Sequence, residues 1–164
     1  MHIRKAEMRD LDDLRRIYAA ARQWMSENGN PTQWGDTWPP EEVYVEDIGL
    51  GRSYVIEEDG RVHAVFALIL GDDPTYSYIE GGAWLDDEPY GTIHRIASDG
   101  ELHGVFQAAV DHSLGIIGNL RVDTHADNAV MHHAIRKAGF ARCGIIYIDD
   151  GTPRTAYQLN ANRA

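Results

Sequence analysis

The spacing of apolar residues along the chain predicts an ordered series of strands and helices. Residues 2–6 read as a first strand, and an apolar stripe with helical spacing then runs from Asp10, the candidate N-cap, towards Met25. The stripe consists of Leu11, Leu14, Ile17, Tyr18 and Ala21. We expect this helix to end at Asn28-Gly-Asn-Pro31, because glycine and proline interrupt helical periodicity.

An irregular loop, a second helix and a hairpin are expected next. The loop covers residues 30–40. Its last two residues, Pro39 and Pro40, and the two glutamates after them predict the start of a helix that ends near Leu50. Ser53–Glu58 and Arg61–Leu70 read as two strands joined at Asp59-Gly60, a strong hairpin signal. The second of these strands is almost wholly apolar, which predicts a central place in a sheet.

Strands and helices also alternate through the second half, after an insertion-like stretch at 72–89. The expected elements are a strand at 91–97, a polar turn at 98–104, a helix at Val105–Leu114, a strand at 120–124, a helix at 128–140 closed by Gly139, and strands at 142–148 and 155–159. A helix that begins after a glycine-containing loop presents free amides to a ligand. The turn at 98–104 is therefore a candidate anion site.

Composition and charge narrow the class of protein. The 164 residues suit one domain with its own core, and the formal net charge of −11 argues against binding to a phosphate backbone. That charge favours a small-molecule or basic partner. Cys143 is the one cysteine, which excludes an internal disulfide and indicates a core residue in preference to a nucleophile. With no signal-peptide pattern or long apolar run, we expect a soluble, cytoplasmic protein without a membrane partner.

Four motifs in the second half follow one another in a recognisable order. They are Ile93-His-Arg-Ile-Ala-Ser98, Glu101-Leu-His-Gly-Val-Phe106, Leu120-Arg-Val-Asp-Thr124, and Arg136-Lys-Ala-Gly-Phe140 on a helix begun by Asn128. With the opening strand and helix, this order resembles the GNAT superfamily of N-acetyltransferases. The resemblance implies a single domain over residues 1–164, of α/β (α+β) class, with a mixed, mostly antiparallel central sheet and helices on both faces. It also implies transfer of an acetyl group from acetyl-CoA to the amine of a small molecule or peptide, by direct attack.

In that family one strand and the loop after it hold the acyl donor, so the resemblance implies a set of donor-binding residues. The set is Ile96, Ala97, Ser98, Leu102, His103, Gly104, Val105, Phe106 and Asn128. The loop departs from the family pattern, because Glu101 stands where the family has Arg or Gln, and Phe106 where it has Gly or Ala. A carboxylate beside a diphosphate is electrostatically unfavourable. Two alternatives need no ligand: Ser98-Asp-Gly-Glu101 also reads as a capping box, and Asn128 as an N-cap, with Asp127 or Thr124 as competitors.

The acid and base of the reaction are less well marked. The family often has a tyrosine that protonates the leaving thiolate, and Ile135 stands at that position, with Tyr157 or Tyr147 as replacements. Candidates for the general base are His94, His125 beside Asp123, and Glu80, each of which also has a purely structural interpretation. No paired histidine motif for a metal exists, since His132 and His133 point to different faces of a helix, and no metal is expected.

Aromatic residues outside the regular elements indicate an acceptor pocket. The predicted lining is Trp24, Trp34, Tyr76 and Trp84, and the alternative is a loop that only closes the end of the core. Arg95 and Arg121 lie on neighbouring predicted strands near Asp123, where we favour an internal ion pair over a substrate clamp. A catalytically inactive GNAT-fold module that binds CoA or senses a ligand is the alternative function. The sequence leaves the oligomeric state open, with a homodimer as one candidate.

Overall fold

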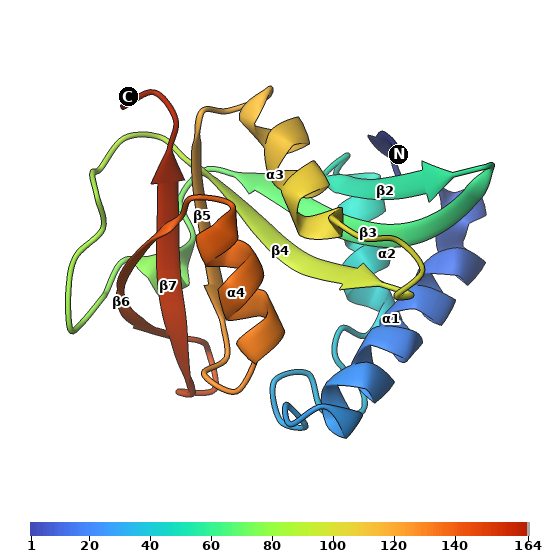
Figure 1. Ribbon diagram of the computed structural model, residues 1–164, viewed down its shortest axis with the longest axis horizontal. Coiled ribbons are helices and arrows are strands. Elements are labelled where there is room, and N and C mark those ends of the chain that lie inside the picture. The colour runs from blue at the N-terminus through green and yellow to red at the C-terminus, as the bar shows by residue number, and fades with distance from the viewer. Residues whose placement is uncertain (164) are drawn as a thin grey trace. The chain divides into compact units, whose positions relative to one another are not determined.

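The structure is a computed structural model that describes residues 1–163, and Figure 1 follows the chain through its elements. The strands are β1 (His2–Lys5), β2 (Ser53–Glu58), β3 (Arg61–Leu70), β4 (Gly91–Ser98), β5 (Asn119–Thr124), β6 (Ala141–Tyr147) and β7 (Pro153–Asn160). The α-helices are α1 (Leu11–Glu27), α2 (Glu41–Gly49), α3 (Val105–Leu114) and α4 (Ala129–Lys137), and single 3₁₀ turns lie at Met8–Asp10 and Pro74–Tyr76. The elements expected from the sequence are therefore present in their expected order.

The strands form one seven-stranded sheet in the order β1-β2-β3-β4-β5-β7-β6. β4 and β5 are parallel, pairing Gly91 with Leu120 and Thr92 with Arg121. The pairs β1–β2, β2–β3, β5–β7 and β6–β7 are antiparallel. A mixed sheet of this kind with α-helices confirms the predicted α/β class.

The β2–β3 hairpin forms where the sequence predicts it. The backbone φ angle is +51° at Asp59 and +77° at Gly60, the two consecutive positive values that a tight two-residue hairpin turn requires. From this turn the register runs from Glu58 opposite Arg61 to Ser53 opposite Ala67, with one irregularity after Ile56.

By internal packing the chain forms two compact units, residues 1–68 with 94–109 and residues 69–93 with 110–164. In the first unit, α1 buries one face, as its apolar stripe predicts. Leu14, Ile17 and Tyr18 of that face pack in one cluster with Tyr44 of α2 and with valines of β2 and β3. The second unit has a cluster of its own, in which Tyr76 and Tyr90 pack with Ile146 of β6 and Ala156 of β7. The stretch at 72–89 is thus part of that core.

The sequence made three capping predictions, for α4, for α1 and for the turn before α3. Asn128 caps α4, since its Oδ1 accepts the amide of Met131 at 3.2 Å, so the N-cap interpretation is confirmed over Asp127 and Thr124. Asp10 occupies the N-cap position of α1, as predicted, but makes no side-chain capping bond there, because its carboxylate accepts the Glu7 amide and the Arg4 guanidinium, each at 2.8 Å.

The capping box at Ser98–Glu101 is wrong, because α3 begins only at Val105 and the residues before it form an open turn. Among residues 1–163, no helix has the length and apolar composition that would let it cross a membrane.

Candidate active site

The turn between β4 and α3 presents a row of backbone amides that no protein group uses. Across residues 1–163, the amides of Leu102–Val105 have no hydrogen-bond acceptor. The two amides before them are used within the turn: Gly100 donates to Ser98 Oγ at 3.1 Å, and Glu101 donates to Asp99 Oδ1 at 3.0 Å. The free amides lie at the N-terminus of α3, where the helix dipole favours negative charge. This turn therefore keeps the geometry of an anion site.

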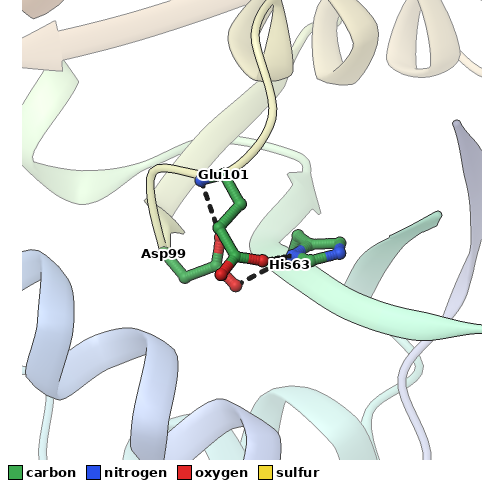
Figure 2. A group of neighbouring side chains, drawn as sticks. All are labelled: His63, Asp99 and Glu101. Carbon is green, nitrogen blue, oxygen red and sulfur yellow. Dashed lines mark hydrogen bonds and ion pairs between the residues drawn. The ribbon is translucent and has the colours of Figure 1, made fainter.

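The two carboxylates of this turn converge on one histidine of β3 (Figure 2). His63 Nδ1 lies 2.9 Å from Asp99 Oδ2 and 3.1 Å from Glu101 Oε2. Arg16 of α1 adds an ion pair to Asp99 at 3.0 Å, and Arg61 adds one to Glu101 at 3.5 Å. The negative charge that the sequence places in the anion loop is therefore offset by cations and by a hydrogen-bonding imidazole.

The pKa of Asp99 reflects this environment. Burial of its carboxyl group opposes ionisation, but hydrogen bonds from the Glu101 amide, Arg16 and His63 outweigh burial and lower its pKa. Asp99 is thus held as a carboxylate by the groups around it. The cluster was not found from the sequence, because His63 and Asp99 are 36 positions apart and nothing local marks them as partners.

The same three side chains have the spacing of metal ligands. His63, Asp99 and Glu101 each offer one ligand atom, and these three atoms lie within 4.8 Å of one another. This is the one such group among the described residues. Both carboxylates already bind an arginine, and a cation would have to compete with Arg16 and Arg61 for them. We therefore interpret the cluster as a charge-balancing network of the turn.

β4 carries an unusual backbone conformation just before the candidate donor residues. Arg95 has a φ of +51°, which the Cβ atom of any non-glycine residue disfavours, and two buried residues of the first unit hold it in place. Tyr18 donates its hydroxyl to the Arg95 carbonyl at 3.0 Å. Asp47, 1% exposed, accepts from the Arg95 guanidinium at 2.8 and 2.9 Å and from Arg52 at 2.8 Å. This conformation shapes the strand immediately before Ile96.

The predicted donor residues differ in exposure. Ile96, Ser98, Leu102 and Val105 are half-buried, Ala97 and Phe106 are buried, and His103 and Gly104 are exposed, all in the first unit, while Asn128 is buried in the second. Phe106 is 8% exposed, so its ring belongs to the interior and does not stand over the turn. Gly104 has a φ of +74°, which explains why glycine follows His103 here.

The three candidate bases have different surroundings. His94 is half-buried in β4. His125 Nδ1 accepts the amide of Asp127 at 3.0 Å, so the ring nitrogen that lacks a proton is already used in a turn. Asp123, the residue expected beside His125, accepts the hydroxyl of Tyr76 at 2.6 Å. Glu80 is exposed and accepts hydrogen bonds from Tyr147 and from Tyr78, and these lower its pKa.

Replacing Tyr147 with phenylalanine is expected to raise the pKa of Glu80 towards its ordinary value, because the lost hydrogen bond stabilised the carboxylate. A lowered folded-state pKa stabilises the fold at neutral pH, and that stabilisation is lost as pH falls through it. Tyr147→Phe should therefore reduce the acid sensitivity contributed by Glu80. Carbon-detected NMR titration of the Glu80 carboxyl measures this directly, with Tyr78→Phe expected to give the smaller rise. An unchanged pKa in Tyr147→Phe would contradict the assignment.

The four predicted acceptor-site aromatics do not share one environment. In the second unit, Tyr76 and Trp84 contact each other with ring centroids 4.9 Å apart, and Trp84 donates to the Tyr76 carbonyl at 2.9 Å. In the first unit, Trp34 packs against the core beside Tyr18, whereas Trp24 is 46% exposed near the end of α1. Tyr76 is 2% exposed, which indicates a core role for that ring.

The expected ion pair of Arg95 or Arg121 with Asp123 is wrong. Arg95 pairs with Asp47, and the guanidinium of Arg121 lies 4.1 Å from the Trp84 ring centroid and 3.9 Å from that of Tyr90. Arg121 also donates to a backbone carbonyl, that of Asp86, at 2.8 Å. Aromatic faces attract guanidinium groups. The spacing of residues along the strands did not predict this contact of Arg121.

Ile135 is fully buried, so a core residue occupies the position where the family often has a tyrosine.

His132 and Tyr157 of the second unit form a hydrogen-bonded pair that the sequence did not predict. His132 Nε2 lies 3.1 Å from the His125 carbonyl, an acceptor only, and must carry the proton. Burial lowers the pKa of His132, so its Nδ1 accepts the hydroxyl of Tyr157 at 2.6 Å. Tyr157 is 1% exposed.

Cys143 is a core residue, as preferred from the sequence. Its side chain is 4% exposed, its thiol donates to the Ala141 carbonyl at 3.4 Å, and burial raises the thiol pKa. A thiol held in its protonated form is a poor nucleophile, so this residue does not offer a covalent route.

Comparison with known proteins gives matches among solved structures. No protein-family model matches the sequence, and a search of curated proteins finds no match. A GNAT-family acetyltransferase from Streptococcus agalactiae is 31% identical over 97% of this chain and 94% of that chain, with a TM-score of 0.89.

Two further structures share the fold at lower identity. A GNAT-family acetyltransferase from Listeria monocytogenes is 20% identical over 96% of this chain and 92% of that chain, with a TM-score of 0.69. YncA from Salmonella typhimurium, solved with its cofactor acetyl-CoA, is 15% identical over 99% of this chain and 95% of that chain, with a TM-score of 0.64.

Proposed function

Because the chain belongs to the GNAT superfamily of acetyltransferases, we propose that it transfers an acetyl group from acetyl-CoA to the amine of a small molecule or peptide. Acetyl-CoA supplies the acetyl group as a thioester. The observation that carries the proposal is the row of free amides at Leu102–Val105, at the start of α3. Such amides bind a diphosphate without requiring any particular side chain.

The departures from the family pattern in this turn do not oppose the proposal. The charge of Glu101 is offset by Arg61, its carboxylate also lies 3.1 Å from His63 Nδ1, and Phe106 is directed into the interior. The backbone of Ile96 and Ala97, before the turn, would support the pantetheine arm of the donor, as the resemblance implies. Asn128 caps α4 in the second unit, and its expected contact with the donor stays a prediction.

An attacking amine must lose its proton, and we assign the base to His94. His125 uses its unprotonated nitrogen in a turn, and the pKa of Glu80 is lowered, which makes it a weaker base at neutral pH. His94 lies in β4, two residues before Ile96. The Tyr157 hydroxyl already donates to His132, so we assign no acid for the leaving thiolate. A thiol pKa of about 8.5 makes thiolate a fair leaving group at neutral pH without full protonation.

Calorimetric titration of acetyl-CoA into the purified protein, followed by thiol release on a panel of amines, tests the proposal. We expect binding in the micromolar range, about −8 kcal/mol, and much weaker binding of pantetheine, which lacks the diphosphate. Thiol release should depend on an amine, and His94→Ala should lower kcat by about 100-fold without a comparable loss of acetyl-CoA affinity.

The outcomes separate the two candidate functions. Binding without thiol release on any amine would favour the alternative, a GNAT-fold module that binds CoA or senses a ligand, which the buried Ile135 supports. No binding of acetyl-CoA would defeat the acetyltransferase and the CoA-binding form of the alternative. The small-molecule or peptide acceptor, the cytoplasmic location and the homodimer remain predictions, the last of which sedimentation velocity would check.

A further inference from the structure

Nearly every arginine in this chain has a partner, and the exceptions lie together. Within residues 1–163, the guanidinium groups of Arg136 and Arg142 form no ion pair, hydrogen bond or ring contact. The other arginines bind a carboxylate, a hydroxyl or a backbone carbonyl, as expected in a chain with 26 acidic and 15 basic residues. Two neighbouring guanidinium groups without an acidic partner are unusual in so acidic a chain and are free to bind an anion.

Both of these arginines line one cavity of the second unit, with a volume of about 320 Å³, between α4 and the β6–β7 pair. His132, Thr155 and Tyr157 line it with them, and no Asp or Glu does. A cavity of similar size on α1 shows the contrast, because there Arg22 stands beside Glu27 and Asp36. The cavity beside α4 is therefore the more cationic of the two.

The rest of the cavity lining offers hydroxyl groups that can hydrogen-bond to a polar ligand. Thr155 is 9% exposed, and its hydroxyl has no hydrogen-bond partner in the described part of the chain. The Tyr157 hydroxyl donates to His132, so its remaining lone pair can accept from a ligand. Since Nε2 of His132 is bound to the His125 carbonyl, the imidazole fixes the tyrosine and takes no part in binding the anion.

We propose that this cavity is a binding site for a small oxyanion, a phosphate or carboxylate group held by Arg136 and Arg142. Guanidinium groups match these oxyanions through two parallel hydrogen bonds, and Thr155 supplies a third donor. The volume admits a small phosphorylated or carboxylated metabolite rather than a polymer. The cavity is lined by other residues than the turn at Leu102–Val105, and the proposal does not depend on acetyl transfer.

NMR titration of the purified protein with inorganic phosphate and, separately, with malonate tests the proposal. Saturable shifts are expected at the Arg136 and Arg142 side-chain Nε–H groups and at the Thr155 amide. The double variant Arg136→Gln/Arg142→Gln should weaken binding about tenfold or more. Lys137→Gln is the matched control, because it removes one positive charge from the same helix without touching the cavity, and it should change the affinity by less than about twofold.

The two ligands distinguish the source of the oxyanion. Saturation by phosphate alone indicates a phosphorylated ligand, and saturation by malonate alone indicates a carboxylated one. Each of these results supports the site. Lack of saturation by either, shifts confined to other residues, or equal weakening in Lys137→Gln would overturn it. Both arginines and Lys137 are exposed, and thermal melts would verify that the variants keep the fold.

Discussion

Replacing Asp47 with alanine is expected to destabilise the fold by about 3–5 kcal/mol, because it leaves the guanidinium groups of Arg52 and Arg95 without their shared carboxylate. Asp47 is 1% exposed, and the side chain of Arg95 is 13% exposed, so solvent cannot fully replace the lost partner. The loss also removes the side-chain anchor that holds Arg95 at a φ of +51°. Urea denaturation followed by tryptophan fluorescence measures the change in the free energy of unfolding.

The control for this prediction is Asp12→Ala. The side chain of Asp12 is 96% exposed and pairs with Arg15 on α1, and its loss should cost about 1 kcal/mol or less. Asp47→Asn keeps one acceptor oxygen and should fall between the two. If Asp47→Ala were no less stable than Asp12→Ala, the buried network could not be what maintains this part of β4.

Replacing His63 with alanine is expected to raise the KM for acetyl-CoA about tenfold. Glu101 and Asp99 would lose the imidazole that contacts both carboxylates, and only Arg16 and Arg61 would offset their repulsion of a diphosphate bound at the proposed site. The KM for acetyl-pantetheine, which has no diphosphate, should change by less than about twofold. Steady-state thiol release with the two donors gives both values. High salt should reduce the difference, since it screens the repulsion.

A second substitution separates charge from general damage. In His63→Ala/Glu101→Gln the repelling charge is gone, so the KM for acetyl-CoA should return towards the wild-type value. His2→Ala, an exposed histidine of β1, serves as the control for histidine loss. Equal increases in KM for both donors, or no recovery in the double variant, would rule out a charge-compensating role.

Local sequence signals predicted the elements of the fold, because each has a physical origin within a few residues. Asp59-Gly60 tolerates two positive φ angles, and Gly139, with a φ of +99°, lies just beyond α4. The helical stripe of α1 has one buried face and therefore one possible orientation towards its core. Such signals need no knowledge of distant residues.

The contacts that define the candidate site are not local, and sequence reasoning missed them. Asp47 and Arg95 are 48 positions apart, and no pattern predicts that a non-glycine residue in β4 will adopt a positive φ. Asp123 had two plausible arginine partners on neighbouring strands and instead binds Tyr76. The sequence identified residue types suited to the chemistry, whereas their pairing depended on which distant elements pack together.

An isolated antiparallel bridge joins Glu80 to Ile145 of β6, and it affects how this protein behaves at high concentration. β6 is the last strand of the sheet, and the backbone groups of Ile145 are bonded to Glu80 at 2.8 and 3.0 Å. Gly82 and Gly144 permit this close approach, since a Cβ on Gly82 would lie 2.0 Å from the Cys143 carbonyl oxygen. The segment thus occupies positions where a strand of another molecule would otherwise add, and it protects an exposed edge from aggregation.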